Sequence, residues 1–374
     1  MEKIGIYIHI PFCKKKCFYC DFTAFQNLES WIDSYFENLK KEIILYQKNM
    51  NVEVDSIYIG GGTPTYVDYH YIIELVEILK NFDLSNVKEF TIEANPNSLT
   101  LEKLKAYKNL GINRISLGVQ SFDDKVLKKI GRDHNKEIVL KDIENIRKAG
   151  FDNISLDMIL NLPGGNFDSI KKDLEIIKKI NPEHLSYYSL ILEKGSHFYS
   201  LYKKDKLKLM DDDLERDIFS YIEKYLKDIG LNRYEISNFS KKGFESYHNK
   251  KYWSEGGYLA FGLGASGFLS NVRYNNVKNF VKYEKLINEG KFPIEFREFI
   301  SKDEREKEYI IFKLREVEGI NLKEFENIFG HSLLEKYSEI VEKFYKERFF
   351  IIDKNLRFTH KGFDLSNEFY IEII

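Results

Sequence analysis

The three cysteines of this chain are the side chains best suited to bind a metal. Cys13, Cys17 and Cys20 are the only cysteines among 374 residues, and they follow a short apolar segment that is typical of a strand. Because three residues and then two residues separate them, a tight loop would let their sulfurs converge on one small inorganic centre. An odd number of thiols, without a segment that resembles a secretion signal, argues against a disulfide framework.

Two kinds of metal centre are compatible with this spacing. Structural zinc sites usually have four protein ligands, so zinc would need His9 or a histidine distant in the sequence as the fourth. An iron-sulfur cube on three cysteines leaves one iron without a protein ligand, and a catalytic metal needs such an open position. We therefore favour the iron-sulfur centre and keep zinc as the alternative.

The cysteine motif also resembles a known one. A C-x3-C-x2-C motif after a strand, with an aromatic residue directly before the last cysteine, is similar to that of the radical S-adenosylmethionine (radical SAM) superfamily. The resemblance implies a 4Fe–4S cluster whose unique iron is chelated by the methionyl amine and carboxylate of SAM. One electron from the reduced cluster then cleaves the sulfonium bond and gives a deoxyadenosyl radical. In such proteins the cofactors supply this chemistry, and the chain supplies orientation and shelter from water.

The elements that must position these groups alternate regularly. Strands are expected at 4–10, 56–59, 89–93, 114–119, 153–160 and 184–190, and helices between them, for example at 28–46, 71–80, 137–149 and 169–180. This alternation predicts a parallel sheet with helices outside and functional groups at the carboxyl ends of the strands. The resemblance favours a partial (β/α)6 radical SAM barrel over an open doubly wound sheet.

Glycines and polar side chains follow the expected strands. The loop Gly60-Gly61-Gly62-Thr63-Pro64 could let the backbone approach a ligand closely, or it could form a tight turn. Taken singly, the polar residues at strand ends would usually be structural caps or surface groups. The resemblance implies that the series binds SAM through Tyr7, Gly62, Thr63, Glu93, Gln120, Arg132 and Asp157.

The expected roles follow from the chemistry of these side chains. A carboxylate such as Glu93 or Asp157 can accept hydrogen bonds from ribose hydroxyls or from the ammonium group. Arg132 can hold the methionyl carboxylate as a charge-assisted pair. Tyr19 is expected to shape the adenine pocket, although it could equally belong to the core.

Further segments narrow the resemblance to one branch of the superfamily. The segments 7–13, 131–134, 184–188 and 234–239 resemble the coproporphyrinogen III oxidase-like branch, over nearly the whole chain. This branch contains oxygen-independent coproporphyrinogen III oxidases and HemW-type heme chaperones. The oxidases carry a further cysteine at the position of Phe22. We therefore expect a chaperone that transfers heme to acceptor proteins; the alternatives are the oxidase and another radical SAM enzyme.

A second motif supports the chaperone. The letters HNKKYW at 248–253 match the HNxxYW signature that the resemblance associates with heme binding. Imidazole is a common axial ligand of heme iron, so His248 could ligate it, while Tyr252 and Trp253 could offer a flat apolar surface. The alternative is a histidine that fixes a loop and two aromatic residues of the core. Ser266 stands where a further histidine would be expected, so no second iron ligand is predicted there.

Three parts are expected along the chain. The radical SAM barrel would span residues 1–230. A family-specific extension that contains the HNxxYW motif would span residues 231–292, and a small winged-helix-like α+β domain would span residues 293–374. In the last part, helices are expected at 304–315, 322–328 and 333–345, and short strands at 349–352 and 357–359. The charges of this tail are mixed and it has no basic recognition helix, so it should cover the barrel or bind a protein.

Composition restricts the class of protein. Charged residues make up 31% and hydrophobic ones 43% of the chain, with a formal net charge of −2, which is unlike a nucleic-acid binder. No apolar stretch is long enough to predict a transmembrane helix, and peripheral membrane contact stays open. Thiolate ligands predict a reducing, cytoplasmic location. Lys14, Lys15 and Lys16 would attract an acidic electron donor such as flavodoxin, or form a solvated surface. Whether the protein is itself an enzyme is left open.

Overall fold

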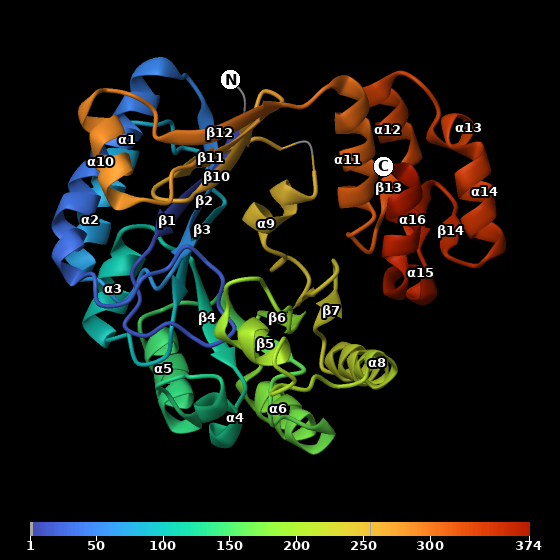
Figure 1. Ribbon diagram of the computed structural model, residues 1–374, viewed down its shortest axis with the longest axis horizontal. Helices are drawn as coiled ribbons and strands as arrows, with labels where there is room; N and C mark the ends of the chain where they lie inside the picture. Colours follow the sequence, from blue (N-terminus) through green and yellow to red (C-terminus); the bar gives the residue numbers. More distant parts are fainter. Residues whose placement is uncertain (1–2, 255) are drawn as a thin grey trace.

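The strands of the computed structural model, which describes residues 3–254 and 256–374, form one large sheet and one small sheet (Figure 1). The large sheet has twelve strands in the order β12-β11-β10-β9-β1-β2-β3-β4-β5-β6-β8-β7. Its centre consists of six parallel strands: β1 (Lys3–Ile10), β2 (Glu53–Gly61), β3 (Glu89–Ala94), β4 (Arg114–Gln120), β5 (Ile154–Leu160) and β6 (His184–Ser189). All six lie where the sequence predicts them, within a few residues.

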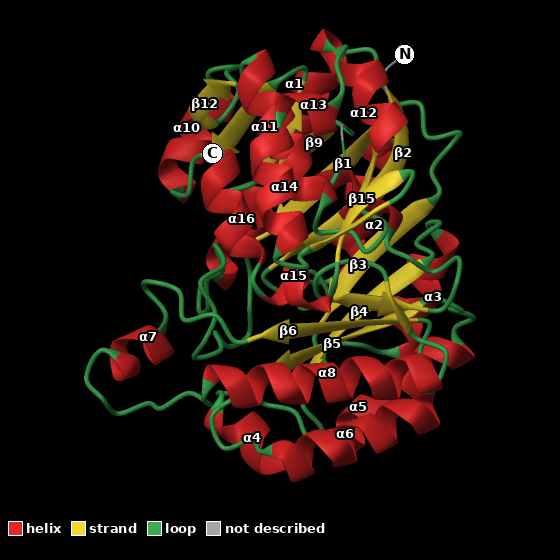
Figure 2. Ribbon diagram, turned by 90° about the vertical axis from the view of Figure 1, so that its right-hand side faces the viewer, coloured by secondary structure: helices red, strands yellow, loops and turns green. Residues whose placement is uncertain are grey.

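Helices connect these strands and cover the outside of the curved sheet. They are α1 (Ile32–Asn49), preceded by the short 3-10 helix η1 (Glu29–Trp31), and α2 (Tyr69–Leu79), α3 (Leu101–Asn109), α4 (Asp124–Lys129), α5 (Lys136–Lys148) and α6 (Phe167–Ile180). Most begin at a polar cap, such as Asn166, which forms a capping box with Ser169. In Figure 2, α5 and α6 lie along the side of β4, β5 and β6. The predicted partial (β/α)6 barrel is therefore confirmed.

Side chains alternate strictly between the two faces of the parallel strands. On β4, Ile115, Leu117 and Val119 are fully buried in the core shared with the helices, whereas Arg114 and Gln120 point to the opposite face. We call this opposite face the inner face. The helices α1 to α6 cover the outer face, and the inner face carries polar groups such as Arg114, Ser116 and Gln120.

The segment after β6 extends both edges of the large sheet. It forms α7 (His197–Tyr202), α8 (Asp212–Asp228), β7 (Asn232–Arg233), β8 (Asn238–Ser240) and α9 (Tyr247–Tyr252). It then returns as β9 (Tyr258–Phe261), which pairs in parallel with β1, and continues through β10 (Ser266–Leu269), β11 (Val272–Asn276), α10 (Phe280–Asn288) and β12 (Ile294–Phe299). Figure 1 shows α9 between the large sheet and the C-terminal helices.

The last part of the chain has its own sheet and its own core. It contains α11 (Lys302–Lys313), β13 (Ile320–Asn321), α12 (Leu322–Phe329), α13 (Leu333–Lys336), α14 (Ser338–Lys346), β14 (Phe350–Ile352), β15 (Asn355–Phe358), α15 (His360–Asp364) and α16 (Ser366–Ile373). Its three strands are antiparallel in the order β13-β15-β14, as the winged-helix expectation requires. One predicted helix, 333–345, is divided at Tyr337, and the strand β13 and the helices α15 and α16 were not predicted.

The boundaries at 230 and 292 stay a prediction. The extension supplies strands to the large sheet, and β12 pairs with β11 across the second boundary. Among the described residues, no helix is long and apolar enough to cross a lipid bilayer.

Candidate cluster and SAM site

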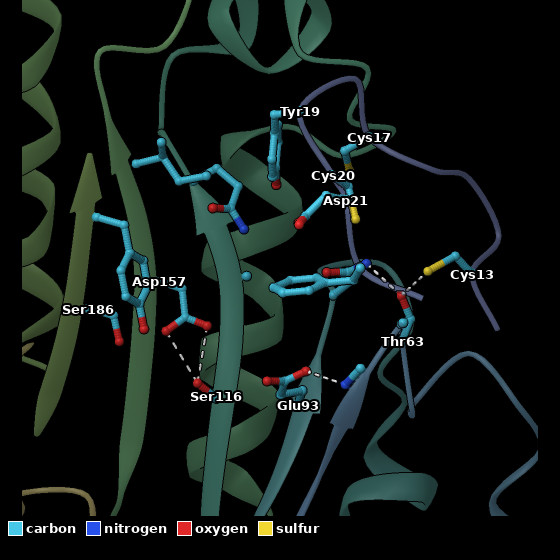
Figure 3. A pocket seen from close by; sticks show the side chains of 18 of the residues that line it. Cys13, Cys17, Tyr19, Cys20, Asp21, Thr63, Glu93, Ser116, Asp157 and Ser186 are labelled. Atoms are coloured by element: carbon cyan, nitrogen blue, oxygen red, sulfur yellow. Dashed lines mark hydrogen bonds between the residues drawn. The ribbon is translucent and has the colours of Figure 1, made fainter. Parts of the chain in front are cut away.

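One cavity at the carboxyl ends of the parallel strands collects most of the predicted site residues. It has a volume of about 370 Å³ and is lined by Cys13, Cys17, Tyr19, Cys20, Gly62, Thr63, Glu93, Gln120, Arg132 and Asp157, among others. Figure 3 shows the cysteine side chains on one side of this cavity and the two carboxylates on another. The fold therefore brings together residues that span more than a third of the chain.

Backbone hydrogen bonds close the segment that carries the cysteines, residues 11–25, which we call the cysteine loop. The amide of Cys13 donates to the carbonyl of Phe25 at 2.9 Å, and the amide of Phe25 donates to Pro11 at 2.8 Å, so the loop closes on itself. A turn from Cys17 to Cys20 follows, with an amide-to-carbonyl distance of 3.2 Å. In Figure 3, the side chains of Cys17 and Cys20 lie next to each other, and that of Cys13 lies below them.

The residue proposed as a fourth zinc ligand, His9, is already engaged in hydrogen bonds. No group of three His, Cys, Asp or Glu side chains among the described residues is arranged to hold one ion. Both ring nitrogens of His9 are already bonded, Nδ1 to the Tyr7 hydroxyl at 2.9 Å and Nε2 to the Thr23 carbonyl at 2.7 Å. His9 would therefore have to give up one of these hydrogen bonds to complete a zinc site with the cysteines.

Burial favours the protonated thiol at two of the cysteines. It raises the pKa of Cys20 to about 11 and also raises the pKa of Cys13. Cys13 Sγ lies 3.5 Å from the Thr63 hydroxyl, which favours the thiolate but does not outweigh burial. A cluster that bound here would therefore have to displace protons from these two residues.

The glycine loop after β2 packs against backbone. The amide of Gly62 donates to the carbonyl of Ile10 at 2.8 Å, and a Cβ at Gly62 would lie 2.7 Å from the carbonyl oxygen of Phe12. Gly61 has a φ of +112°, and a Cβ there would lie 2.6 Å from the His9 ring. Close packing against the backbone and side chains of residues 9–12 thus requires glycine at both positions, and Gly61, Gly62 and Thr63 also line the cavity.

Two partly buried carboxyl groups line the cavity, Glu93 of β3 and Asp157 of β5. Glu93 accepts hydrogen bonds from the Tyr58 hydroxyl at 2.8 Å and from the Gly61 amide at 2.9 Å, and burial raises its pKa to about 7. Asp157 accepts from the Ser116 hydroxyl at 3.1 Å, and burial raises its pKa although nearby Arg114 opposes the shift. Both groups can therefore accept further donors from a ligand.

Arg132 is held rigidly beside the cysteines. Its Nη1 donates to Asn95 Oδ1 at 3.0 Å and its Nη2 to the Gly118 carbonyl at 2.8 Å. Its Nε is buried and has no hydrogen-bond partner within the described part of the chain. A buried donor without a partner is costly, so this atom fits an anionic group of a ligand. Gln120, at a left-handed φ of 69°, completes the same wall.

Some predicted residues lie elsewhere. Tyr7 does not line the cavity but stacks on Tyr58, with ring centroids 6.2 Å apart. His248 is fully buried, with Nδ1 3.0 Å from Ser56 Oγ and Nε2 3.0 Å from the Tyr252 hydroxyl. Burial lowers its pKa to about 3. Trp253 borders another cavity next to α11, so the structure does not bring His248 and Trp253 to one cavity.

Sequence reasoning also missed residues that line the cavity. These are Tyr58, Arg114, Ser116, Ser186 and Asn249, together with apolar residues at its mouth. The signal that could have found most of them is the alternation of strands. Ser116 lies four residues before Gln120 on β4, so it must share the inner face with it.

Comparisons with known proteins agree with this geometry. Residues 7–177 match the family model of the radical SAM superfamily. The heme chaperone HemW of Lactococcus lactis is 38% identical and aligns with 97% of this chain and 95% of its own length. HemW of Bacillus subtilis is 35% identical, with 97% of each chain covered. The solved structure of coproporphyrinogen III oxidase (HemN) from Escherichia coli has a TM-score of 0.87 at 22% identity, over 100% of this chain and 90% of its own, which shows a shared fold.

Proposed function

This chain belongs to the HemW family of the radical SAM superfamily, and from that premise we propose that it binds a 4Fe–4S cluster, SAM and heme and transfers heme to acceptor proteins. The observation that carries the proposal is the single cavity that contains the three cysteines and the residues predicted to bind SAM. We propose the cytoplasm as its location, because thiolate ligands of a cluster need a reducing compartment.

The residues around the cavity fit these two cofactors. Cys13, Cys17 and Cys20 would hold the cluster, which supplies the electron when bound. Arg132 would receive the methionyl carboxylate at its free Nε, close to the cysteine loop. Glu93 and Asp157 would accept hydrogen bonds from the amine and the ribose, and Tyr19 would border the adenine.

We propose that heme binds at the HNKKYW segment, residues 248–253. The first five of these residues belong to α9, and we call α9 the HNKKYW helix. Tyr252 and Trp253 border the cavity beside α11, where Arg273 and Arg305 also lie. Aromatic side chains give a porphyrin a flat apolar surface, and arginines suit its carboxylates. His248 could ligate the iron only after its imidazole leaves Ser56 or Tyr252, because both nitrogens are bonded.

The lysines of the cysteine loop support docking of an electron donor. Lys14 already pairs with Asp133 at 3.1 Å, and Lys16 donates to the Phe22 carbonyl at 3.1 Å. Lys15 makes no ion pair within the described residues and lines the cavity. We propose that an acidic protein such as flavodoxin approaches this loop.

Anaerobic reconstitution tests the whole proposal. We expect the wild-type protein to retain iron and acid-labile sulfide, to bind heme stoichiometrically, and not to convert coproporphyrinogen III. Cys17→Ser should lose iron and sulfide, because two thiolates cannot hold a cube firmly. Lys15→Ser, in the same loop, should retain both and serves as the control.

Two outcomes would contradict the proposal. If the purified protein contained zinc and no sulfide, the cysteines would form a zinc site and not a cluster site. Sustained coproporphyrinogen turnover would identify an oxidase despite Phe22, which stands 62% exposed at the cavity where the oxidases are expected to have a cysteine.

A further inference from the structure

We propose that His248 is a positioning residue of the SAM cavity, because it supports Tyr58, which in turn holds the carboxylate of Glu93. The inference rests on the proposed function in taking SAM as the ligand of this cavity. It gives the HNKKYW helix a role in cofactor binding that is separate from ligation of iron.

The first link is between Glu93 and Tyr58. The Tyr58 hydroxyl donates to Glu93 Oε1 at 2.8 Å, while the Gly61 amide donates to Oε2 at 2.9 Å. The space around them is tight, because a Cβ at Gly60 would lie 2.9 Å from both the Glu93 carboxyl carbon and the Tyr58 ring. The carboxylate can therefore keep its orientation only while Tyr58 stays in place.

The second link is between Tyr58 and His248. The centroids of the two rings lie 5.3 Å apart at an interplanar angle of 31°, and Tyr58 also stacks on Tyr7, with centroids 6.2 Å apart. Tyr58 thus has two ring neighbours. Removal of the imidazole would open a gap on one side of Tyr58 and let its ring tilt away from Glu93.

The third link fixes the imidazole itself. Nδ1 is bonded to Ser56 and Nε2 to Tyr252, both at 3.0 Å, and the backbone amide of His248 points to Glu89 at 3.4 Å. A Cβ on Gly5 would lie 3.0 Å from the imidazole Cε1, so the ring has no space to move toward β1. A ring bonded at both nitrogens and packed on its faces is well suited to act as a support.

The strand geometry explains why one helix can do this. Ser56, Tyr58 and Gly60 alternate along β2 and therefore share the inner face. His248 bonds the first of them and packs at a tilt against the second, while Asn249, the next residue of α9, lines the cavity directly. The helix α9 thus contacts the proposed SAM site both directly and through Tyr58.

SAM affinity of the anaerobically reconstituted protein tests the inference. We expect Tyr58→Phe to weaken SAM binding about tenfold, as for the loss of one hydrogen bond to a carboxylate. His248→Ala should weaken it by a similar factor, and His248→Phe, which restores a ring against Tyr58, should recover part of the loss. The double variant His248→Ala with Tyr58→Phe should bind SAM no more weakly than the worse single variant, because both changes act through one contact.

Tyr247→Phe is the matched control. Tyr247 lies on the same helix as His248, and its hydroxyl also donates to a carboxylate, that of Asp55 in β2, at 2.9 Å. Neither Tyr247 nor Asp55 lines the cavity. We expect its SAM affinity to remain within twofold of wild type. The melting temperature of each variant distinguishes two effects. A general loss of stability would lower the melting temperature but leave the SAM affinity of the folded protein unchanged, whereas a positioning effect lowers that affinity.

The remaining outcomes overturn the inference in distinguishable ways. Unchanged SAM affinity in both single variants would refute it and leave the proposed function standing. A His248→Ala protein that binds SAM normally but loses its heme absorption would assign His248 to the iron instead. A wild-type protein that retains its cluster but binds no SAM would refute the proposed function together with the inference.

Discussion

Three carboxyl groups of this protein have pKa values far above the usual range of an acid side chain. Burial raises the pKa of Glu42, Glu93 and Asp173 to about 7 in each case. Each one nevertheless accepts hydrogen bonds that limit the shift, for example from the Ser121 hydroxyl to Asp173 at 2.9 Å. Because these groups bind protons more tightly in the folded protein than when exposed, they make its stability depend on pH between about 4 and 7.

Glu42 of α1 gives the clearest prediction. It is fully buried and accepts from the Gly262 amide at 2.8 Å, from Asn276 at 2.7 Å and from the Tyr283 hydroxyl at 2.5 Å. The folded pKa of about 7 exceeds the unfolded value of 4.5, so its contribution to stability is greatest at low pH and declines as the pH rises through 7. The loss should be about 2 kcal/mol between pH 5 and pH 8.

Urea unfolding of wild type and Glu42→Gln across this pH range measures the effect. The free energy of unfolding of wild type should fall relative to that of the variant as the pH rises. Glu93 and Asp173 titrate in the same range in both proteins, so their contributions cancel in the difference. Parallel pH profiles for the two proteins would contradict the prediction.

Residue-level reasoning found the chemistry but not its supports. The cysteines, Glu93 and Asp157 are recognisable because their types and positions match a motif. Tyr58 and Arg114 carry no such signal, since an aromatic or basic residue in a strand is common. Their position is apparent only from the alternation of side chains along β2 and β4, which places Tyr58 and Arg114 on the same face as the recognised residues.

At the scale of elements, the central strands were predictable and the edges were not. The strands β1 to β6 are long, apolar and regularly spaced, whereas β7 and β13 have two residues each and β12 is largely exposed. The HNKKYW motif shows a second limit. His248 and Tyr252 are four residues apart on α9 and share a face, but Trp253 is five residues from His248 and lies on another.

Glu306 of α11 should stabilise the C-terminal part. Its Oε1 accepts from Lys336 at 2.9 Å, from the Tyr337 hydroxyl at 2.9 Å and from His331 at 3.1 Å, and its side chain is 1% exposed. Burial opposes ionisation, but these donors outweigh it, and the pKa of Glu306 is lowered. Glu306→Gln should therefore reduce the free energy of unfolding by about 1 to 3 kcal/mol at neutral pH.

The pH dependence has the opposite sign to that of Glu42. Because the folded pKa is lowered, the stabilisation is present above the unfolded value of 4.5 and is lost as the pH falls through the folded value. Thermal unfolding of the variant at pH 7 measures the effect. Glu324→Gln, an exposed residue of α12, is the control and should be nearly neutral. Equal destabilisation by the two changes would contradict the role of the cluster around Glu306.

At the scale of the whole molecule, the core of the large sheet and the core of the C-terminal part are joined by hydrogen bonds, ion pairs and cation–π contacts. One core joins the large sheet to its helices, and a smaller one holds α11 to α16 together. Between them, the Val317 amide donates to the Tyr234 carbonyl at 2.9 Å, Lys250 lies 3.9 Å from Glu316, and Arg315 lies 5.2 Å from the Trp253 ring. The helix α9 therefore touches both the SAM cavity and the C-terminal part.

The two tryptophans can report on these cores separately. Trp31 packs on Phe280 of the larger unit at 5.2 Å, while Trp253 lies against Phe312 and Arg315 of the smaller one. Each variant keeps one reporter: Trp31→Phe leaves Trp253, and Trp253→Phe leaves Trp31. We expect the fluorescence emission of Trp253 to shift to the red at a lower urea concentration than the emission of Trp31. The reason is that the smaller core buries less apolar surface and separates from α9 before the large sheet unfolds. Coincident midpoints would show instead that α9 couples both cores into one cooperative unit.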